Sequence, residues 1–207
     1  MDGNGTGLRE RKKARTRRLI ADCAASLFAD HGYEHVSVSD VARKAEVAEQ
    51  TVYNYFPTKE RLVTDRDEQI QERLCDLIRS RPADVTTVAA VRGFVLEFVA
   101  GIGSISPALW RGELGHLAGA SPTVYRLALE LTDRQAAAFA AAIGDSTPVR
   151  PEIAKFQGIA LAGVFQFIVS HVARRTREGL GQAEIAGELY PMVENILDEL
   201  DHWLTPR

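Results

Sequence analysis

The chain has 207 residues, of which 45% are apolar and 26% are charged, so it is long enough to bury one sizeable core or two small ones. It has two cysteines and begins without an apolar signal segment, which excludes a disulfide-stapled secreted protein and leads us to expect the cytoplasm. The net charge is -3, but for nucleic-acid binding the distribution of charge matters more than its sum.

Basic residues are concentrated near the N-terminus. The segment LRERKKARTRR at residues 8–18 contains a single acid, Glu10, and seven basic residues: Arg9, Arg11, Lys12, Lys13, Arg15, Arg17 and Arg18. Such a run favours contact with a phosphate backbone. A solvated, frayed helix start has the same composition, and that alternative stays open on this feature alone.

Helical periodicity dominates from Arg17 onward, without a stretch of strict two-residue alternation bounded by turn residues, so we predict an all-α fold. The first predicted helix ends at Gly32. Ser37 and Asp40 have the spacing of a helix N-cap with an acid at the third position, and they predict a short second helix. A third helix covers residues 49–56 and ends at Pro57.

The third helix has two different faces when its residues are placed at about 100° intervals. Val52, Tyr53 and Phe56 are expected to pack on the preceding helices. The other face is polar and consists of Gln50, Thr51, Asn54 and Tyr55. Two short helices joined by a short turn form a helix-turn-helix, whose second helix can enter the major groove of DNA. Glutamine and asparagine in that position can make paired contacts with adenine.

Lys59 lies in the first turn of the next predicted helix, after Thr58 as N-cap. A cation at this end of a helix has the unfavourable sign for the helix dipole, unless an anion lies beside it. A DNA phosphate would serve. The alternative is a solvated lysine paired with Glu60 or Asp65.

Residues 17–63 resemble the N-terminal DNA-binding domain of the TetR family of bacterial transcriptional regulators, over about a quarter of the chain. The resemblance is carried by Ala-Ala and Leu-Phe in the first helix, the Gly32-Tyr33 turn, Val-Ala in the second helix, and Thr-Val-Tyr-x-Tyr-Phe-x-x-Lys-Glu-x-Leu. It implies phosphate or sugar contacts by Ser37, Thr51, Tyr53, Tyr55 and Lys59. It implies base contacts by Gln50 and Asn54, with Tyr55 in part.

Two positions depart from the pattern of this family. Glu46 stands where a turn glycine is common, and Ala48 stands where a capping serine is common. The missing cap is expected to weaken the third helix by about 1 kcal/mol. Glu49 in the first turn offsets part of this loss through the helix dipole. The operator sequence therefore does not follow from the resemblance.

The remainder of the chain is predicted to form further helices at residues 59–79, 84–103, 107–118, 122–143, 151–178 and 182–204. The longest apolar run falls short of the roughly 20 residues of a membrane span, so we interpret it as a buried helix. We expect a DNA-binding domain at residues 1–65 and a regulatory domain at residues 66–207.

The last two helices carry a pattern that favours dimerisation. Leu189, Val193, Ile196, Leu200 and Trp203 form a narrow seam at spacings of four and three. Gly158 and Gly163 would allow close approach of the preceding helix. Packing within one chain is the alternative. The family resemblance favours a homodimer that binds a palindromic DNA operator.

Large apolar residues alternate with polar ones between the linker helix and these last helices. A mostly apolar pocket with a few polar anchors is one arrangement that satisfies such a pattern, and the family commonly binds an inducer there. We predict a small-molecule ligand site made of Phe94, Phe98, Trp110, Glu113, His116, Phe139, Phe165 and Gln166. A satisfied core with acids at the surface is the alternative.

Sequence signals for an enzyme are weak. GIGSIS at residues 101–106 lacks the third glycine of a nucleotide-binding loop and follows no predicted strand. His31 and His35 flank Gly32, and no nearby ligand completes a metal site. We therefore expect no catalytic residue, metal or cofactor. The prediction is a transcriptional regulator, a repressor released from its operator by a largely apolar ligand. The alternative is a helical binding or adaptor protein with a purely structural helix-turn-helix.

Overall fold

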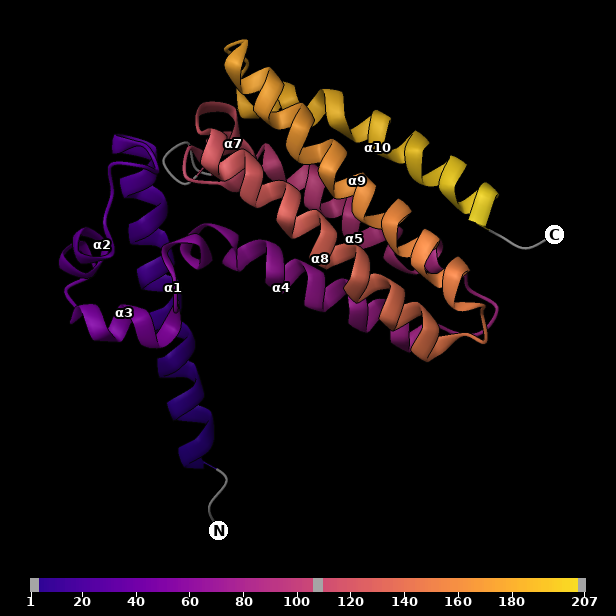
Figure 1. The fold of residues 1–207 in the computed structure, drawn as a ribbon, viewed down its shortest axis with the longest axis horizontal. Coiled ribbons are helices and arrows are strands. Elements are labelled where there is room, and N and C mark those ends of the chain that lie inside the picture. The colour runs from indigo at the N-terminus through magenta and orange to yellow at the C-terminus, as the bar shows by residue number, and fades with distance from the viewer. Residues whose placement is uncertain (1–3, 106–109, 205–207) are drawn as a thin grey trace.

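The structure is a computed structural model that describes residues 4–105 and 110–204. Every regular element in these two ranges is an α-helix, which confirms the predicted fold class. The helices are α1 (Asn4–His31), α2 (Val38–Lys44), α3 (Glu49–Tyr55), α4 (Lys59–Ser80), α5 (Thr87–Ile102), α7 (Leu114–Ala120), α8 (Pro122–Ser146), α9 (Pro151–Arg177) and α10 (Gln182–Leu204). Helices α1 to α3 lie at one end of the molecule, and α4 leads from them to a bundle of α5 and α8 to α10 (Figure 1).

The first helix starts well before the predicted residue Arg17. The basic segment is part of α1, because arginine, lysine and alanine all have high helix propensity. The helix ends as predicted: Gly32 adopts a φ of 79°, and its amide donates to the carbonyl of Phe28 at 2.9 Å. Figure 1 shows the N-terminal half of α1 extending past α3, away from the bundle.

The start of α2 confirms the predicted N-cap, and the turn after α2 shows the backbone at the two positions that depart from the family pattern. The amide of Asp40 donates to Ser37 Oγ at 3.1 Å, and the amide of Ser37 donates to Asp40 Oδ2 at 2.9 Å, so the capping box is present. Ala48 caps α3 without a side-chain hydrogen bond. Glu46 has a φ of 55°, which lies in the left-handed region where glycine is favoured.

The N-terminal helices share their core with the rest of the chain. In this N-terminal core, residues of α1 to α4 pack together with residues of α7, α8 and α9: Ile20, Ala24, Phe28, Val41, Val52, Phe56, Leu62, Leu114, Leu117, Val124, Ala128, Leu131 and Ala173. A second core fills the bundle and includes Leu74, Ile78, Val95, Phe139, Leu161, Ile168, Leu189 and Leu197. Helix α4 continues through residues 65 and 66 without a break. The division into domains at 1–65 and 66–207 stays a prediction.

The later helices match their predicted ranges closely, with one exception. Pro122 and Pro151 are the first residues of α8 and α9. The helix predicted at 107–118 begins in residues outside the described range; the described part of this region contains α7, which starts only at Leu114. Helix α9 is long and apolar enough to cross a membrane by length and composition. Its contacts with α7, α8 and α10 are those of a core helix.

Three of the residues predicted at a dimer interface lie inside the single chain. Leu189 and Val193 are fully buried in the bundle core. A Cβ on Gly158 would lie 2.4 Å from the carbonyl oxygen of Ala136, so this glycine serves the contact between α8 and α9. The prediction is wrong for these three residues, because a repeat of small or apolar residues does not tell which neighbouring helix it meets.

The other four predicted dimer residues are more accessible. Ile196 and Leu200 are half-buried against the bundle core. Gly163 is exposed, and a Cβ added to it would meet no described heavy atom of another helix within 4 Å. Trp203 is 72% exposed. A contact with a second chain at these positions stays a prediction.

Candidate nucleic-acid interface and ligand cavity

The outer face of α3 carries exposed hydrogen-bonding side chains. Gln50 and Asn54 are both exposed, and Gln50 Nε2 donates to Asn54 Oδ1 at 3.2 Å. Glu49 is held differently, since its carboxylate accepts from Ser39 Oγ on α2 at 2.6 Å. This bond ties the two short helices together, and α3 lies at the edge of the molecule, away from the bundle (Figure 1).

The two tyrosines of α3 exchange the positions predicted for them. Tyr53 is 40% exposed, whereas Tyr55 is half-buried against the N-terminal core. The prediction that Tyr53 packs inward and Tyr55 points outward is wrong. On a wheel of about 100° per residue the two lie at similar angles from the buried pair Val52 and Phe56. The tertiary packing distinguishes them, since Tyr55 packs against the N-terminal core, and Arg17 of α1 donates to its carbonyl at 3.4 Å.

Lys59 lies against aromatic rings. Its Nζ is 4.1 Å from the ring centre of Tyr33 and 6.0 Å from that of Phe28, which is a cation–π arrangement. Burial lowers the pKa of the Lys59 ammonium, while Glu34 and Glu60 act against this shift. Thr58 is the N-cap of α4 but makes no side-chain capping bond.

The basic segment of α1 divides into free and engaged side chains. Arg17 pairs with the buried Asp65, so Asp65 is not the partner of Lys59. Arg18 lies 3.8 Å from Asp22. The other five basic side chains are exposed and form no ion pair with any residue in the described ranges: Arg9, Arg11, Lys12, Lys13 and Arg15. The sequence missed the structural use of Arg17, since its partner is 48 residues away.

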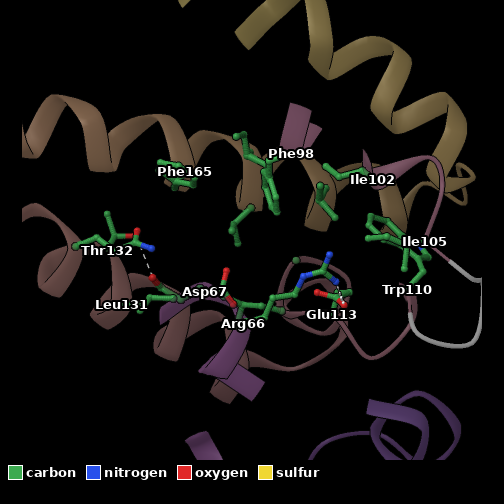
Figure 2. A pocket seen from close by; sticks show the side chains of 17 residues that line it. Arg66, Asp67, Phe98, Ile102, Ile105, Trp110, Glu113, Leu131, Thr132 and Phe165 are labelled. Carbon is green, nitrogen blue, oxygen red and sulfur yellow. Dashed lines mark hydrogen bonds and ion pairs between the residues drawn. The ribbon is translucent and has the colours of Figure 1, made fainter. Parts of the chain in front are cut away.

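A cavity lies between α4, α5, α8 and α9 (Figure 2). Its free volume is about 60 Å³. The walls are largely apolar and include Phe98, Ile102, Ile105, Trp110, Leu114, Leu131, Phe165, Ile168 and Val172. Arg66 reaches along the wall and donates to Glu113 Oε1 at 2.6 Å. Burial raises the pKa of the Glu113 carboxyl, and the neighbouring Arg66 acts in the opposite direction.

Asp67 is a lining residue that the sequence did not lead us to expect. Burial, followed by the charge of Glu113, raises the pKa of its carboxyl to about 7. Asp67 forms no ion pair with any described residue. The signal was present in the sequence: Val63, Asp67, Ile70 and Leu74 follow one another at helical spacing, so a carboxyl interrupts the apolar face of α4.

Gln135 on α8 is a second polar residue in the cavity wall that was not expected there. Its exposed fraction is 3%, and its amide has no hydrogen bond to a described residue. It likewise interrupts an apolar series, from Leu131 to Phe139. Thr132, also in the wall, is satisfied because its hydroxyl donates to Gln166 Oε1 at 2.8 Å.

The cavity brings together only part of the predicted ligand site. Phe98, Trp110, Glu113 and Phe165 line it. Phe94 packs against the bundle core, and Phe139 lines a smaller space on another side of Phe165. His116 and Trp110 make an edge contact at 5.9 Å between ring centres, and His116 Nδ1 is buried without a partner among the described residues. Burial lowers the pKa of His116, with a contribution from Arg111. Gln166 contacts Thr132 and Ser170 instead of the cavity.

The segment before α7 joins the cavity wall to α1. A Cβ on Gly112 would lie 2.3 Å from the carbonyl oxygen of Ala25, so the two backbones are in direct contact. Its neighbours Trp110 and Glu113 line the cavity. A second contact lies beyond α7, where Ser121 Oγ donates to Glu34 at 2.6 Å. A change in the cavity wall therefore has a short physical route to α1.

Comparisons with known proteins agree on the N-terminal region. A family model described as bacterial regulatory proteins, tetR family, matches residues 20–65. The HTH-type transcriptional regulator TcmR of Streptomyces glaucescens is 36% identical over 90 residues, which cover 44% of this chain and 40% of that protein. The chain thus matches less than half the length of this relative.

Solved structures extend the likeness in fold to about nine-tenths of the chain. NalD of Pseudomonas aeruginosa, the secondary repressor of the MexAB-OprM multidrug efflux pump, has a TM-score of 0.56 and 18% identity, covering 91% of this chain and 96% of that chain. The TetR family repressor AlkX from Dietzia sp. strain DQ12-45-1b has a TM-score of 0.54 and 18% identity, covering 89% and 97%.

Proposed function

We propose that this chain, whose residues 20–65 match the model of the tetR family of bacterial regulatory proteins, is a cytoplasmic TetR-family repressor that binds a palindromic DNA operator as a homodimer and leaves it when a small, largely apolar ligand binds. The observation that carries this proposal is the surface formed by α3 and the start of α1. Exposed amides on α3 and five free cations on α1 belong to the same end of the molecule (Figure 1).

This surface has the two components that DNA recognition needs. The cations of α1 supply attraction to phosphates that does not depend on sequence. Gln50 and Asn54 supply side chains that can pair with base edges, and their mutual hydrogen bond holds both on the outer face. Ser37, Thr51, Tyr53 and Lys59 would contact the backbone of DNA. Tyr55 contributes mainly through packing, since it is half-buried.

The homodimer uses the outer faces of α9 and α10. Phe156 and Ile159 on α9 are 62% and 51% exposed, and Trp203 on α10 is also exposed. Gln157 Nε2 donates to the Leu204 carbonyl at 3.5 Å, which brings these residues to one end of the helix pair. Large apolar groups gathered in this way favour a protein interface. Two copies related by a two-fold axis would present two α3 helices to successive major grooves.

Ligand binding acts through the walls of the cavity. A free volume of about 60 Å³ is small beside typical ligand pockets of roughly 300–1,000 Å³, so a ligand must part the helices. Two parts of the wall lead to the DNA-binding helices. Helix α4 carries Arg66 and Asp67 and follows α3 after a turn at residues 56–58, and the segment at Gly112 touches α1. A coupling of about 1–3 kcal/mol between the two sites is typical.

Selection of the purified protein on random duplex DNA, followed by sequencing, tests the DNA-binding part. We expect enrichment of a palindrome and loss of binding as salt increases. Absence of enrichment from a folded dimer would contradict the proposal and favour a helical binding protein. The enriched duplex then serves to screen apolar compounds, and a compound that binds the cavity without weakening DNA binding would contradict ligand release.

Sedimentation velocity tests the dimer interface. Phe156→Asp with Trp203→Asp should convert a dimer to a monomer, because two buried charges without partners oppose association. Tyr125→Asp on α8 is the control, since Tyr125 is also an exposed aromatic residue but lies outside the proposed interface. A dimer that survives the double substitution would place the interface elsewhere.

A further inference from the structure

The described residues that line the cavity include two acidic side chains and one basic side chain. Among the described lining residues, the charged ones are Arg66, Asp67 and Glu113. Arg66 is engaged by Glu113 at 2.6 Å, so these two charges compensate each other. Asp67 has no basic partner of its own among the described residues. When its carboxyl is ionised, the cavity therefore carries an excess negative charge.

The position of Asp67 makes this charge available to a ligand. Figure 2 shows its carboxyl pointing from α4 into the space below Phe98 and Phe165, while the Arg66 side chain runs away from it toward Glu113. Aromatic rings attract cations through their faces, most strongly in the case of tryptophan. Trp110, Phe98 and Phe165 all line this space. A carboxylate and several aromatic rings are the groups that bind organic cations.

We propose that the ligand of this cavity is an apolar molecule that carries one positively charged nitrogen, and that Asp67 is its counter-charge. The inference rests on the proposed function and names the chemical class of the inducer. The ammonium group lies beside the Asp67 carboxylate, and the apolar part of the molecule lies among the aromatic side chains. Gln135 adds an amide whose oxygen can face the positively charged nitrogen.

Other ligand classes fit the charges less well. An anion would face two carboxyls and would have to take Arg66 from Glu113, leaving a half-buried carboxylate unpaired. A neutral ligand would leave Asp67 without a partner, and Asp67 would then keep a proton near neutral pH. A cation stabilises the ionised carboxyl and displaces that proton. Binding should therefore release a proton near pH 7.

A matched pair of compounds isolates the charge. Benzyltrimethylammonium and neopentylbenzene have the same shape and differ in a positively charged nitrogen in place of carbon. Isothermal titration calorimetry of the full-length protein should show about ten- to hundredfold tighter binding of the cation. Calorimetry in two buffers with different ionisation enthalpies should detect the released proton. Only the cation should weaken binding to the selected DNA at equal concentration.

Two variants locate the effect. Asp67→Asn keeps the size of the side chain and should bring the two affinities together while removing proton release. Asp76→Asn removes an exposed carboxylate from the same helix, outside the cavity, and should keep the preference. Thermal melting verifies that both variants fold.

The possible results separate this inference from the function on which it rests. Equal or tighter binding of neopentylbenzene, with release of DNA, would overturn the cationic ligand and leave a ligand-responsive repressor standing. A cation preference that persists in Asp67→Asn would overturn the role of Asp67. Failure of both compounds to bind would overturn the cation site and also count against ligand release from this cavity.

Discussion

Arg17 on α1 holds Asp65 on α4: its Nε lies 3.1 Å from Oδ1 and 3.3 Å from Oδ2 of the carboxylate. The same guanidinium lies 4.9 Å from the ring centre of Phe56, and Asp65 also accepts from Gln69 at 2.8 Å. The pair thus connects the basic helix to the helix that leads into the bundle.

Asp65→Asn should lower the free energy of unfolding by about 1–2 kcal/mol, because a charged hydrogen-bond acceptor is lost at a buried position. The loss is smaller than for a fully buried pair, since Arg17 is partly exposed. Urea titration measures it. Asp76→Asn is the control: its partner Arg79 lies 3.9 Å away at the surface, so its effect should stay below about 1 kcal/mol. Equal effects of both substitutions would contradict the prediction.

Glu46→Gly should stabilise the protein by about 0.5–1 kcal/mol. A side chain at a φ of 55° costs about 1–2 kcal/mol, of which the greater freedom of glycine in the unfolded chain cancels a part. Glu46→Ala is the matched control, because it removes the charge and keeps a Cβ in the left-handed region. Thermal or urea unfolding should rank glycine above alanine, and the reverse order would mean that backbone strain is not the cause.

Gly112→Ala should disturb the contact between the cavity wall and α1. The added Cβ would meet the Ala25 carbonyl oxygen at 2.3 Å and the Ala25 Cα at 2.6 Å, and backbone atoms cannot turn aside as a side chain can. We expect a loss of about 1–3 kcal/mol in stability, together with a changed DNA affinity. Gly93→Ala on α5 has nothing within 4 Å and should instead stabilise by about 0.5–1 kcal/mol. If Gly112→Ala left the free energy of unfolding unchanged, the contact between Gly112 and Ala25 would not be tightly packed.

Asp67 should make stability depend on pH. Its pKa is about 7 in the folded chain and 3.8 for an ordinary aspartate, so the folded state binds more protons between these values. The free energy of unfolding therefore falls as pH rises from about 4 to about 7 and then levels off. The charged groups that act on Asp67 are Glu113, Arg66 and Glu68.

Urea titrations at pH 5 and pH 8 test this dependence. Asp67→Asn should exceed the wild type in stability at both values, and the difference should be larger at pH 8 than at pH 5, by a few kcal/mol at most. Asp76→Asn serves as the control for the loss of an acid from the same helix. A difference between Asp67→Asn and the wild type that stays constant with pH would contradict the raised pKa of this half-buried carboxyl.

Lys12→Ala combined with Lys13→Ala should reduce the salt dependence of DNA binding. Each phosphate contact contributes about 0.9 to the slope of log K against log salt, so two lost contacts reduce the slope by roughly 2. Lys155→Ala on the exposed side of α9 is the control, because that residue lies far along the bundle from the DNA-binding helices. An unchanged slope in the double variant would remove the start of α1 from the interface.

The sequence was informative where a local signal decides the structure. Gly32, Pro122 and Pro151 mark helix ends by their own backbone restrictions, and Ser37 with Asp40 forms a cap within four residues. These features need no knowledge of the tertiary fold. Helix α1 started earlier than predicted because polar residues with high helix propensity give no apolar periodicity to follow.

Side-chain orientation was less predictable, since it depends on neighbours far away in the chain. The exchange of Tyr53 and Tyr55 follows from the packing of Tyr55 against the N-terminal core, and the burial of Leu189 and Val193 follows from their contact with the bundle. Polar residues that interrupt an apolar face were the overlooked signal. Asp67 and Gln135 both interrupt one, and both line the cavity.

The shared N-terminal core limits how the DNA-binding helices can be recombined. Leu114, Leu117, Val124 and Leu131 close its inner side from α7 and α8. A fragment that stops after α3 or early in α4 would expose that apolar side to water and would aggregate or unfold. A chimera that joins these helices to another sensor would therefore need to carry a complementary α7–α8 surface along with them, so the unit of exchange is larger than the helix-turn-helix.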